Sequence, residues 1–133
     1  MHTKSVLQAA DVNRILAAAT KEAQANNWPV AIAVVDDGGH LLGMTRLDAV
    51  ATISAYICQE KAKTAALGRR ESKIYEDIIN GGRVSFLSAP QLQGMLEGGV
   101  PILVDGQVVG AVGVSGVKST EDAQIAKAGI AAL

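Results

Sequence analysis

The chain has 133 residues, enough for one domain that buries about two thirds of the surface its unfolded chain would expose. Its 12 basic and 13 acidic side chains give a net charge of −1, and it contains one Trp, one Phe and two Tyr. This composition excludes a strongly basic surface for the phosphate backbone and offers few aromatic side chains for stacking bases. We therefore expect no nucleic-acid partner.

No apolar run approaches the roughly 20 residues of a membrane-spanning helix, and the N-terminus lacks a signal-peptide core. Cys58 is the only cysteine, which rules out an internal disulfide and a zinc site built from several thiolates. We predict a cytoplasmic protein without membrane contact and without a dedicated metal site. The apolar fraction of 49% also favours a homo-oligomer that buries apolar surface between subunits.

The first half of the chain predicts a helix, a hairpin and a second helix. Apolar residues recur at helical spacing from about Ala9 to Asn26. The β-prone run Val30–Val35 and a return strand His40–Leu47 flank a turn of two Asp and two Gly. A second helix is expected over Thr52–Leu67, with Thr52 as its N-cap.

The second half begins with a short predicted helix over Ser72–Ile79, followed by an irregular segment, residues 83–97, in which a short strand around Met95–Leu96 is expected. Val100–Gly116 contains two apolar runs joined by Asp105-Gly106, a strong hairpin signal. The last helix is predicted from about Thr120, with Ser119 and Asp122 as a pair that caps its start.

Gly110, Gly113 and Gly116 leave one face of the last strand without side chains, which admits either the close approach of a helix or a ligand. Nucleotide binding is disfavoured, because Glu121 and Asp122 place negative charge where a phosphate would approach the last helix. Sequential hairpins with no parallel crossover predict a single α+β domain, residues 1–133. Its expected architecture is an α/β/α three-layer sandwich around a five-stranded antiparallel sheet.

Lys61 is the most distinctive charged residue, because it shares a helix face with Ser54, Cys58 and Ala65 that is suited to packing on the glycine strand. There it would hold a carboxylate, act as an acid or base, or lie at the edge of the core with its ammonium in water. Cys58 is expected to be a small buried residue. His40 follows the first turn and is interpreted as a solvated side chain or as a single ligand to a preformed cofactor.

Three separated segments together resemble one family: VAIAVVDDGGHLLGMTRLDAV, QEKAKTAALGRRES and EGGVPILVDGQVVGAVGVSG with the following EDAQIAKAG. They are similar to the GlcG/HbpS-like family, also called the haem-degrading domain family, over about residues 5–131. The likeness is strongest to its stand-alone GlcG and OrfY members, and the same domain forms the C-terminal part of PduO-type cobalamin adenosyltransferases.

This resemblance implies a profilin-like or roadblock-like sandwich, homo-oligomers, and haem as a candidate cofactor in some members. It also places the stand-alone proteins beside glycolate or glycerol and diol metabolism. Relatives that ligate haem through a histidine of the first helix differ from this chain, which has no histidine between Val12 and Asn26.

Three hypotheses follow. The first is a protein that binds haem or a related tetrapyrrole between the second helix and the glycine strand. The second is a cofactor-free acid–base enzyme that acts on a small hydroxy or oxo compound through Lys61 or Glu97. The third is a structural accessory subunit of a partner enzyme. The candidate ligand-binding residues are Arg46, Lys61, Glu97, Gly98, Gly99, Gly113, Ser115 and His40.

Overall fold

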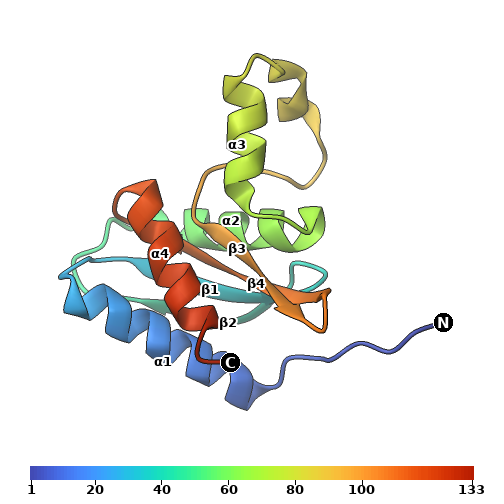
Figure 1. Cartoon of the computed structure of the whole chain (residues 1–133). Helices are drawn as coiled ribbons and strands as arrows, with labels where there is room; N and C mark the ends of the chain where they lie inside the picture. Colours follow the sequence, from blue (N-terminus) through green and yellow to red (C-terminus); the bar gives the residue numbers. More distant parts are fainter.

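The computed structural model describes residues 1–133, which have an α+β fold. Figure 1 shows a twisted sheet with helices on both sides and one helical arm that stands away from it. In chain order the elements are α1 (Ala9–Ala25), β1 (Ala31–Asp36), β2 (Leu41–Arg46), α2 (Ser54–Gly68), α3 (Ser72–Asn80), the 3-10 helix η1 (Val84–Ser88), β3 (Gly99–Val104), β4 (Gln107–Ser115) and α4 (Ser119–Ile130). No helix has the length and apolar character required to cross a membrane.

The sheet has four strands in the order β2-β1-β4-β3, and every neighbouring pair is antiparallel. The two predicted hairpins, β1–β2 and β3–β4, are present, and they are joined through the pairing of β1 with β4. The prediction of a fifth strand is wrong. Its candidate, Met95–Leu96, is irregular chain, because Gly94 packs against the backbone of α2 and the segment has no partner strand.

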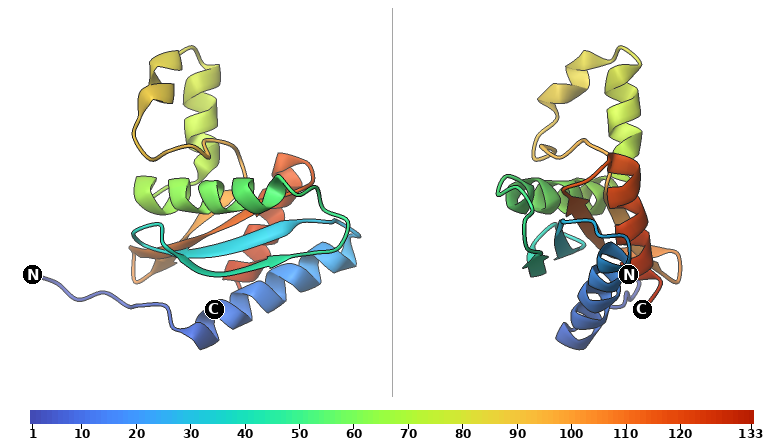
Figure 2. Two further views of the ribbon diagram at one scale, coloured as in Figure 1. Left: turned by 180° about the vertical axis from the view of Figure 1, so that it is seen from behind. Right: turned by 90° about the vertical axis from the view of Figure 1, so that its left-hand side faces the viewer.

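The sheet separates two cores of different composition. On one face, α1 and α4 cover large aliphatic side chains such as Ile15, Ile32 and Ile125, all fully buried. On the other face, α2 packs on small residues of β1 and β4, among them Ala33 and Ala111. Figure 2 shows α2 on one side of the sheet and α1 on the other. The three-layer arrangement is therefore confirmed around a smaller sheet than predicted.

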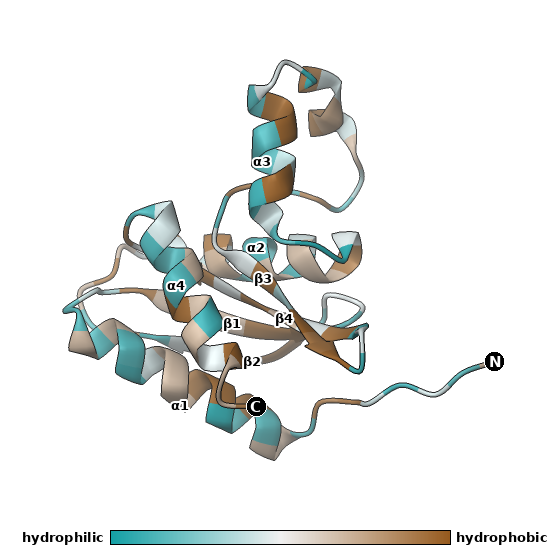
Figure 3. Ribbon diagram, in the orientation of Figure 1, coloured by the Kyte–Doolittle hydropathy of each residue, from teal (hydrophilic) through white to brown (hydrophobic).

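Apolar character is concentrated in the two central strands, and Figure 3 shows β1 and β4 mostly in hydrophobic colours. The residues Ala31–Val35 and Val108–Ser115 are all buried. β2 lies at one edge and exposes Leu41 and Leu42, as expected for a strand with polar residues near its ends. The two central strands are therefore the most buried strands of the sheet, whereas the edge strand β2 exposes two of its apolar side chains.

Two helix starts differ from the prediction. α2 begins at Ser54 with Ile53 as its N-cap, and Thr52 makes no capping hydrogen bond. At α4 the N-cap is Lys118, whose backbone N–H donates to Glu121 at 3.2 Å. Asp122 lies in the interior, where its carboxylate accepts hydrogen bonds from Lys61 of α2 and from the Val117 backbone N–H.

The arm consists of α3, η1 and the segment that returns to the sheet, residues 72–98. In Figures 1 and 2 it projects from the α2 side, away from the rest of the domain. Tyr75 is its most buried aromatic residue, with its ring centroid 5.2 Å from that of Phe86 and with the Arg70 guanidinium 5.3 Å from its own centroid. The arm is therefore held by its own small aromatic cluster rather than by the main cores.

Candidate functional site

Lys61 and Asp122 form an ion pair in the interior of the domain. The Lys61 ammonium donates to Asp122 Oδ2 at 3.1 Å and to the Val114 carbonyl at 2.9 Å. The two residues are 4% and 2% exposed. Because a buried charge is tolerated only when it is paired and hydrogen-bonded, this arrangement satisfies both groups.

The pair joins the two outer layers of the sandwich. Lys61 belongs to α2 and Asp122 to α4, which cover opposite faces of the sheet. Their side chains meet beside Gly98, where a Cβ would lie 2.8 Å from Lys61 Nζ and 2.7 Å from the Val114 carbonyl oxygen. Gly98 also has φ +131°, a conformation that favours glycine. Because Gly98 has no side chain, the Lys61 side chain has room to pass beside it and reach α4.

Burial raises the pKa of the Asp122 carboxyl above its ordinary value, while the Lys61 ammonium and the Val117 backbone N–H, which donates at 3.2 Å, act in the opposite direction. None of the five principal surface cavities is lined by Lys61 or Asp122. Both groups are hydrogen-bonded and neither lines one of these cavities, so the pair links α2 to α4.

The structure gathers most of the other predicted residues near this pair. Gly99 pairs with Gly113 across β3 and β4, and Ser115 Oγ lies 3.5 Å from Ser54 Oγ in the interior. Glu97 is half-buried, and its carboxylate accepts a hydrogen bond from Ser119 at 3.4 Å. Lys61, Gly98, Gly99, Gly113, Ser115 and Glu97 are therefore close neighbours at one end of the sheet.

Arg46 and His40 do not join this group. Arg46 ends β2 and lines a separate surface depression of about 550 Å³ together with Trp28 and Pro29. His40 lies in the β1–β2 turn with a side chain 80% exposed, and its Nδ1 is 3.1 Å from Asp36 Oδ1. The folded chain therefore does not bring Arg46 and His40 together with the other candidate ligand-binding residues.

The space predicted between α2 and the glycine strand is occupied by the helix itself. A Cβ at Gly113 would overlap the Cys58 carbonyl oxygen and lie 2.5 Å from the Ala62 nitrogen. Of the two interpretations of the glycines, the close approach of a helix is confirmed, and the placement of a flat ligand between these elements is corrected. Cys58 is fully buried there, and burial raises the pKa of its thiol to about 11.

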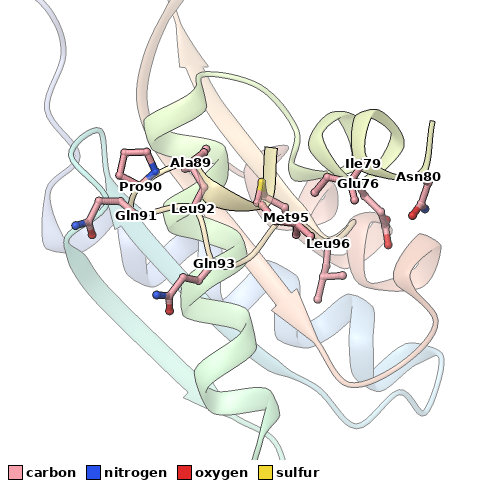
Figure 4. A pocket seen from close by; sticks show the side chains of 11 residues that line it. Glu76, Ile79, Asn80, Ala89, Pro90, Gln91, Leu92, Gln93, Met95 and Leu96 are labelled. Atoms are coloured by element: carbon pink, nitrogen blue, oxygen red, sulfur yellow. The ribbon is translucent and has the colours of Figure 1, made fainter. Parts of the chain in front are cut away.

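The largest cavity lies instead in the arm and has a volume of about 590 Å³. Figure 4 shows side chains from α3 and from the returning segment converging on it. It falls within the usual range for small-molecule sites. Six of its lining residues are hydrophobic, and the full set is Glu76, Ile79, Asn80, Leu87, Ala89, Pro90, Gln91, Leu92, Gln93, Met95 and Leu96.

The returning segment is fastened to the domain at its C-terminal end. The Gly94 backbone N–H donates to Thr64 Oγ1 at 3.2 Å, and the Gly99 N–H donates to Ser72 Oγ at 2.8 Å. Ser72 in turn donates to the Leu96 carbonyl at 2.5 Å. These bonds hold Met95 and Leu96 against the base of α3 and so define one wall of the cavity.

The two ends of the cavity differ in charge. Glu76 and Asn80 lie at one end in Figure 4 and Gln91 at the other. The Glu76 carboxylate accepts the Glu97 backbone N–H at 3.1 Å. At the opposite end, the Lys63 ammonium of α2 donates to Gln91 Oε1 at 2.8 Å. The lining therefore has a carboxylate at one end, and at the other end a glutamine that is engaged by a lysine from outside the lining.

Sequence reasoning does not find this cavity, because residues 83–97 have no helical or strand periodicity and predict an irregular segment. One signal is available in the sequence: Leu87, Leu92, Met95 and Leu96 are a high density of large apolar side chains for a loop. The structure contains no group of three or more His, Cys, Asp or Glu side chains placed to hold a metal ion.

Comparison with known proteins identifies the family. The model of a family described as "Haem degrading protein HbpS-like" matches residues 7–131. The chain belongs to the HbpS-like family. It is 60% identical over 115 residues to the protein GlcG of Escherichia coli K12, covering 86% of this chain and 85% of GlcG.

Solved structures share the fold of this HbpS-like protein. The OrfY protein of Klebsiella pneumoniae matches with a TM-score of 0.91 and 27% identity, over 99% of this chain and 93% of OrfY. A structure described as a PduOC–haem complex matches with a TM-score of 0.87 and 28% identity, over 97% and 96% of the two chains. The predicted family and its relation to PduO are thus confirmed.

Proposed function

We propose that this HbpS-like protein binds haem or a related tetrapyrrole in the cavity of the arm. The observation that carries the proposal is the cavity itself, which is large and mainly apolar. The segment that forms it, residues 72–98, contributes no residue to either of the two main cores. The family description names haem degradation, and one similar structure is a haem complex. Both support haem as the ligand.

The residues that line the cavity fit the chemistry of the group. Ile79, Leu87 and Leu92 provide apolar walls for a flat macrocycle. Met95 supplies a thioether, one of the side chains that hold haem iron in proteins. Lys63 does not line the cavity, but its ammonium donates to the lining residue Gln91 and so lies near that end. When bound, haem would supply its own redox chemistry, and the protein's part is to bind it, orient it and exclude water.

The test is a titration of purified protein with haemin, followed by the Soret band. We expect saturable binding with one haem per cavity, and Ala89→Trp should abolish it because the indole fills the space between η1 and the returning segment. Ala25→Trp, at the exposed end of α1, is the matched control and should bind as the wild type does. A wild-type protein that shows no saturation at micromolar concentration would refute the proposal.

The acid–base alternative is supported less well by the geometry. Its candidate proton carriers are Lys61, which is engaged inside the domain, and Glu97, which accepts a hydrogen bond from Ser119. Neither side chain lines one of the principal cavities. No observation on the folded chain favours it over haem binding.

We also propose that the protein is a homo-oligomer. Leu41 and Leu42 on the edge strand β2 and Ile53 and Tyr56 on α2 are large apolar side chains that are 42–71% exposed. Surfaces of this kind are commonly buried between subunits. Light scattering should give a mass above the 13.7 kDa of one chain, and Leu42→Glu should lower it. A monomeric wild type would contradict this proposal.

The physiological role that we propose is accessory to glycolate or to glycerol and diol metabolism. It is supported by the likeness to GlcG and to the corrinoid adenosyltransferase PduO of Salmonella typhimurium, with which this chain is 28% identical. A strain without the protein should grow more slowly on one of these carbon sources. Rescue by the wild type but not by Ala89→Trp would connect the role to the cavity.

A further inference from the structure

A surface depression outside the arm contains two charges of opposite sign. Its volume is about 550 Å³, and it lies between the end of α1 and the chain that follows β2, which meet at the same end of the domain in Figures 1 and 2. Its only charged residues are Arg46 and Asp48. Both are exposed, and neither takes part in any of the six ion pairs of the structure. A ligand that enters the depression therefore meets both charges unpaired.

The charges favour a ligand that carries a positive and a negative group. The last turn of α1 has no basic residue, so the partial negative charge at the carboxyl end of this helix is not compensated. The Asp48 carboxylate adds a full negative charge to the same lining, which suits an ammonium group. The Arg46 guanidinium is the only cation there, and its planar fork matches a carboxylate.

Two residues of the lining have a strained backbone. Asn27 has φ 56° and Ala49 has φ 68°, in the left-handed region that residues other than glycine rarely adopt. Asparagine tolerates this region better than alanine, so Ala49 is the more unusual of the two. Strain of this kind gathers at binding and active sites, where the surrounding structure fixes the conformation. It occurs here at the same depression as the two unpaired charges.

The rest of the lining offers an apolar surface. Trp28, Pro29 and Leu47 line the depression, and Trp28 and Leu47 also pack against the core under α1 and α4. Their positions are therefore fixed by the interior of the domain. An indole ring buries a large apolar area, so the aliphatic part of a small ligand would pack against Trp28.

We infer that this depression binds a free α-amino acid with an apolar side chain. Arg46 binds its carboxylate, Asp48 and the carboxyl end of α1 receive its ammonium, and Trp28 packs against its side chain. The inference goes beyond the proposed function and does not rest on it, because the depression shares no residue with the cavity of the arm.

The test is a titration followed by the fluorescence of Trp28, which is the only tryptophan of the chain and so reports on this depression alone. Four probes share a branched aliphatic chain. They are leucine, isocaproate without the ammonium, isoamylamine without the carboxylate, and leucate with a hydroxyl in place of the ammonium. We expect a saturable change with leucine, and binding of the other three that is weaker by about fivefold or more, as expected for the loss of one exposed ion pair.

Two variants separate the roles of the charges. Arg46→Gln should weaken the binding of leucine and isocaproate about fivefold and leave that of isoamylamine unchanged, because the amine has no carboxylate. Asp48→Asn should weaken leucine and isoamylamine by a similar factor and leave isocaproate unchanged. Arg83→Gln and Asp105→Asn are matched losses of an exposed charge outside the lining, and they should change none of these affinities.

Several results would overturn the inference. One is a wild-type protein whose fluorescence shows no saturable change with leucine. Another is leucate or isocaproate binding as tightly as leucine, since the site would then receive no ammonium. An equal loss for all ligands in Arg46→Gln would refute the pairing of this residue with the carboxylate. Haem binding is followed separately by the Soret band, so its failure would refute the proposed function and leave this inference standing.

Discussion

The two sides of α2 differ in how they are packed. The side toward the sheet is closed, because backbone lies directly against backbone, and the side toward the arm is open, because it borders a cavity. Toward the sheet, α2 lies so close to β4 that Gly113 leaves no room for a Cβ beneath Cys58. Toward the arm, its Lys63 reaches Gln91 at the rim of a cavity of about 590 Å³. Close approach of backbones gives stability but leaves no space, so the ligand site that we propose lies where large side chains of α3 and of an irregular segment converge.

The largest effect is expected from a methyl group between α2 and β4. Gly113→Ala would place its Cβ against the backbone at Cys58 and Ala62, and we expect a loss of about 5 kcal/mol in the free energy of unfolding. Gly81→Ala, in the arm, is the matched control and should cost about 1 kcal/mol, because Gly81 has φ −74° and its Cβ would make its closest contact with the Asp77 carbonyl oxygen, at 3.1 Å. Urea denaturation measures both. Equal costs would show that the sheet side is no more closely packed than the arm.

The second effect concerns the ion pair that crosses the sandwich. Lys61→Met leaves the Asp122 carboxylate buried without its partner, and we expect a loss of about 4 kcal/mol. Asp122→Leu should cost a similar amount by leaving the ammonium unpaired. The double variant Lys61→Met, Asp122→Leu should lose much less than the sum, because no isolated charge remains. Additive losses in the double-mutant cycle would contradict a direct coupling.

The third effect appears at alkaline pH, again on the closed side. Burial raises the pKa of the Cys58 thiol in the folded protein from 9.0 to about 11. Above pH 9 the unfolded chain releases this proton while the folded chain retains it, so the folded state loses stability as the pH rises from 9 to 11. The loss approaches about 3 kcal/mol at the upper end. Cys58→Ala should lack this part of the pH dependence, whatever its stability at neutral pH. Parallel curves for both proteins between pH 8 and 11 would show that the buried thiol is not responsible.

The parts of the fold that can be predicted are those with a local signal. Period-2 and period-3.6 patterns identify both hairpins and the helices. Gly113 correctly indicates a close approach, because a bare strand position opposite a helix of small residues allows the two backbones to come into contact. The prediction of a fifth strand is wrong because Met95–Leu96 has no partner once Gly94 is pressed against α2.

The candidate site can be predicted only in part. Lys61 is distinctive in the sequence because it is a charged residue among small ones on its helix face. Its partner Asp122 lies 61 residues away. The spacing of Asp122 from Ser119 predicts a helix cap instead, a role that Glu121 has in the structure. Local spacing contains no information about such a pair. The cavity escapes prediction for a related reason: its walls come from α3 and from an aperiodic segment, and only tertiary hydrogen bonds such as that of Gly94 to Thr64 bring them together.

The smallest effect on stability is expected in the arm, where the effect on binding should be large. Ile79→Ala removes apolar surface from a half-buried residue of the cavity wall, so we expect a loss of about 1 kcal/mol in the free energy of unfolding. Haem affinity should fall severalfold, since the same side chain would contact the ligand. Ile74→Ala, on an exposed position of α3, should change neither quantity by a comparable amount. If Ile79→Ala destabilised the protein as strongly as Gly113→Ala, the arm would have to be regarded as part of the closed core, and the division between the two sides of α2 would not hold.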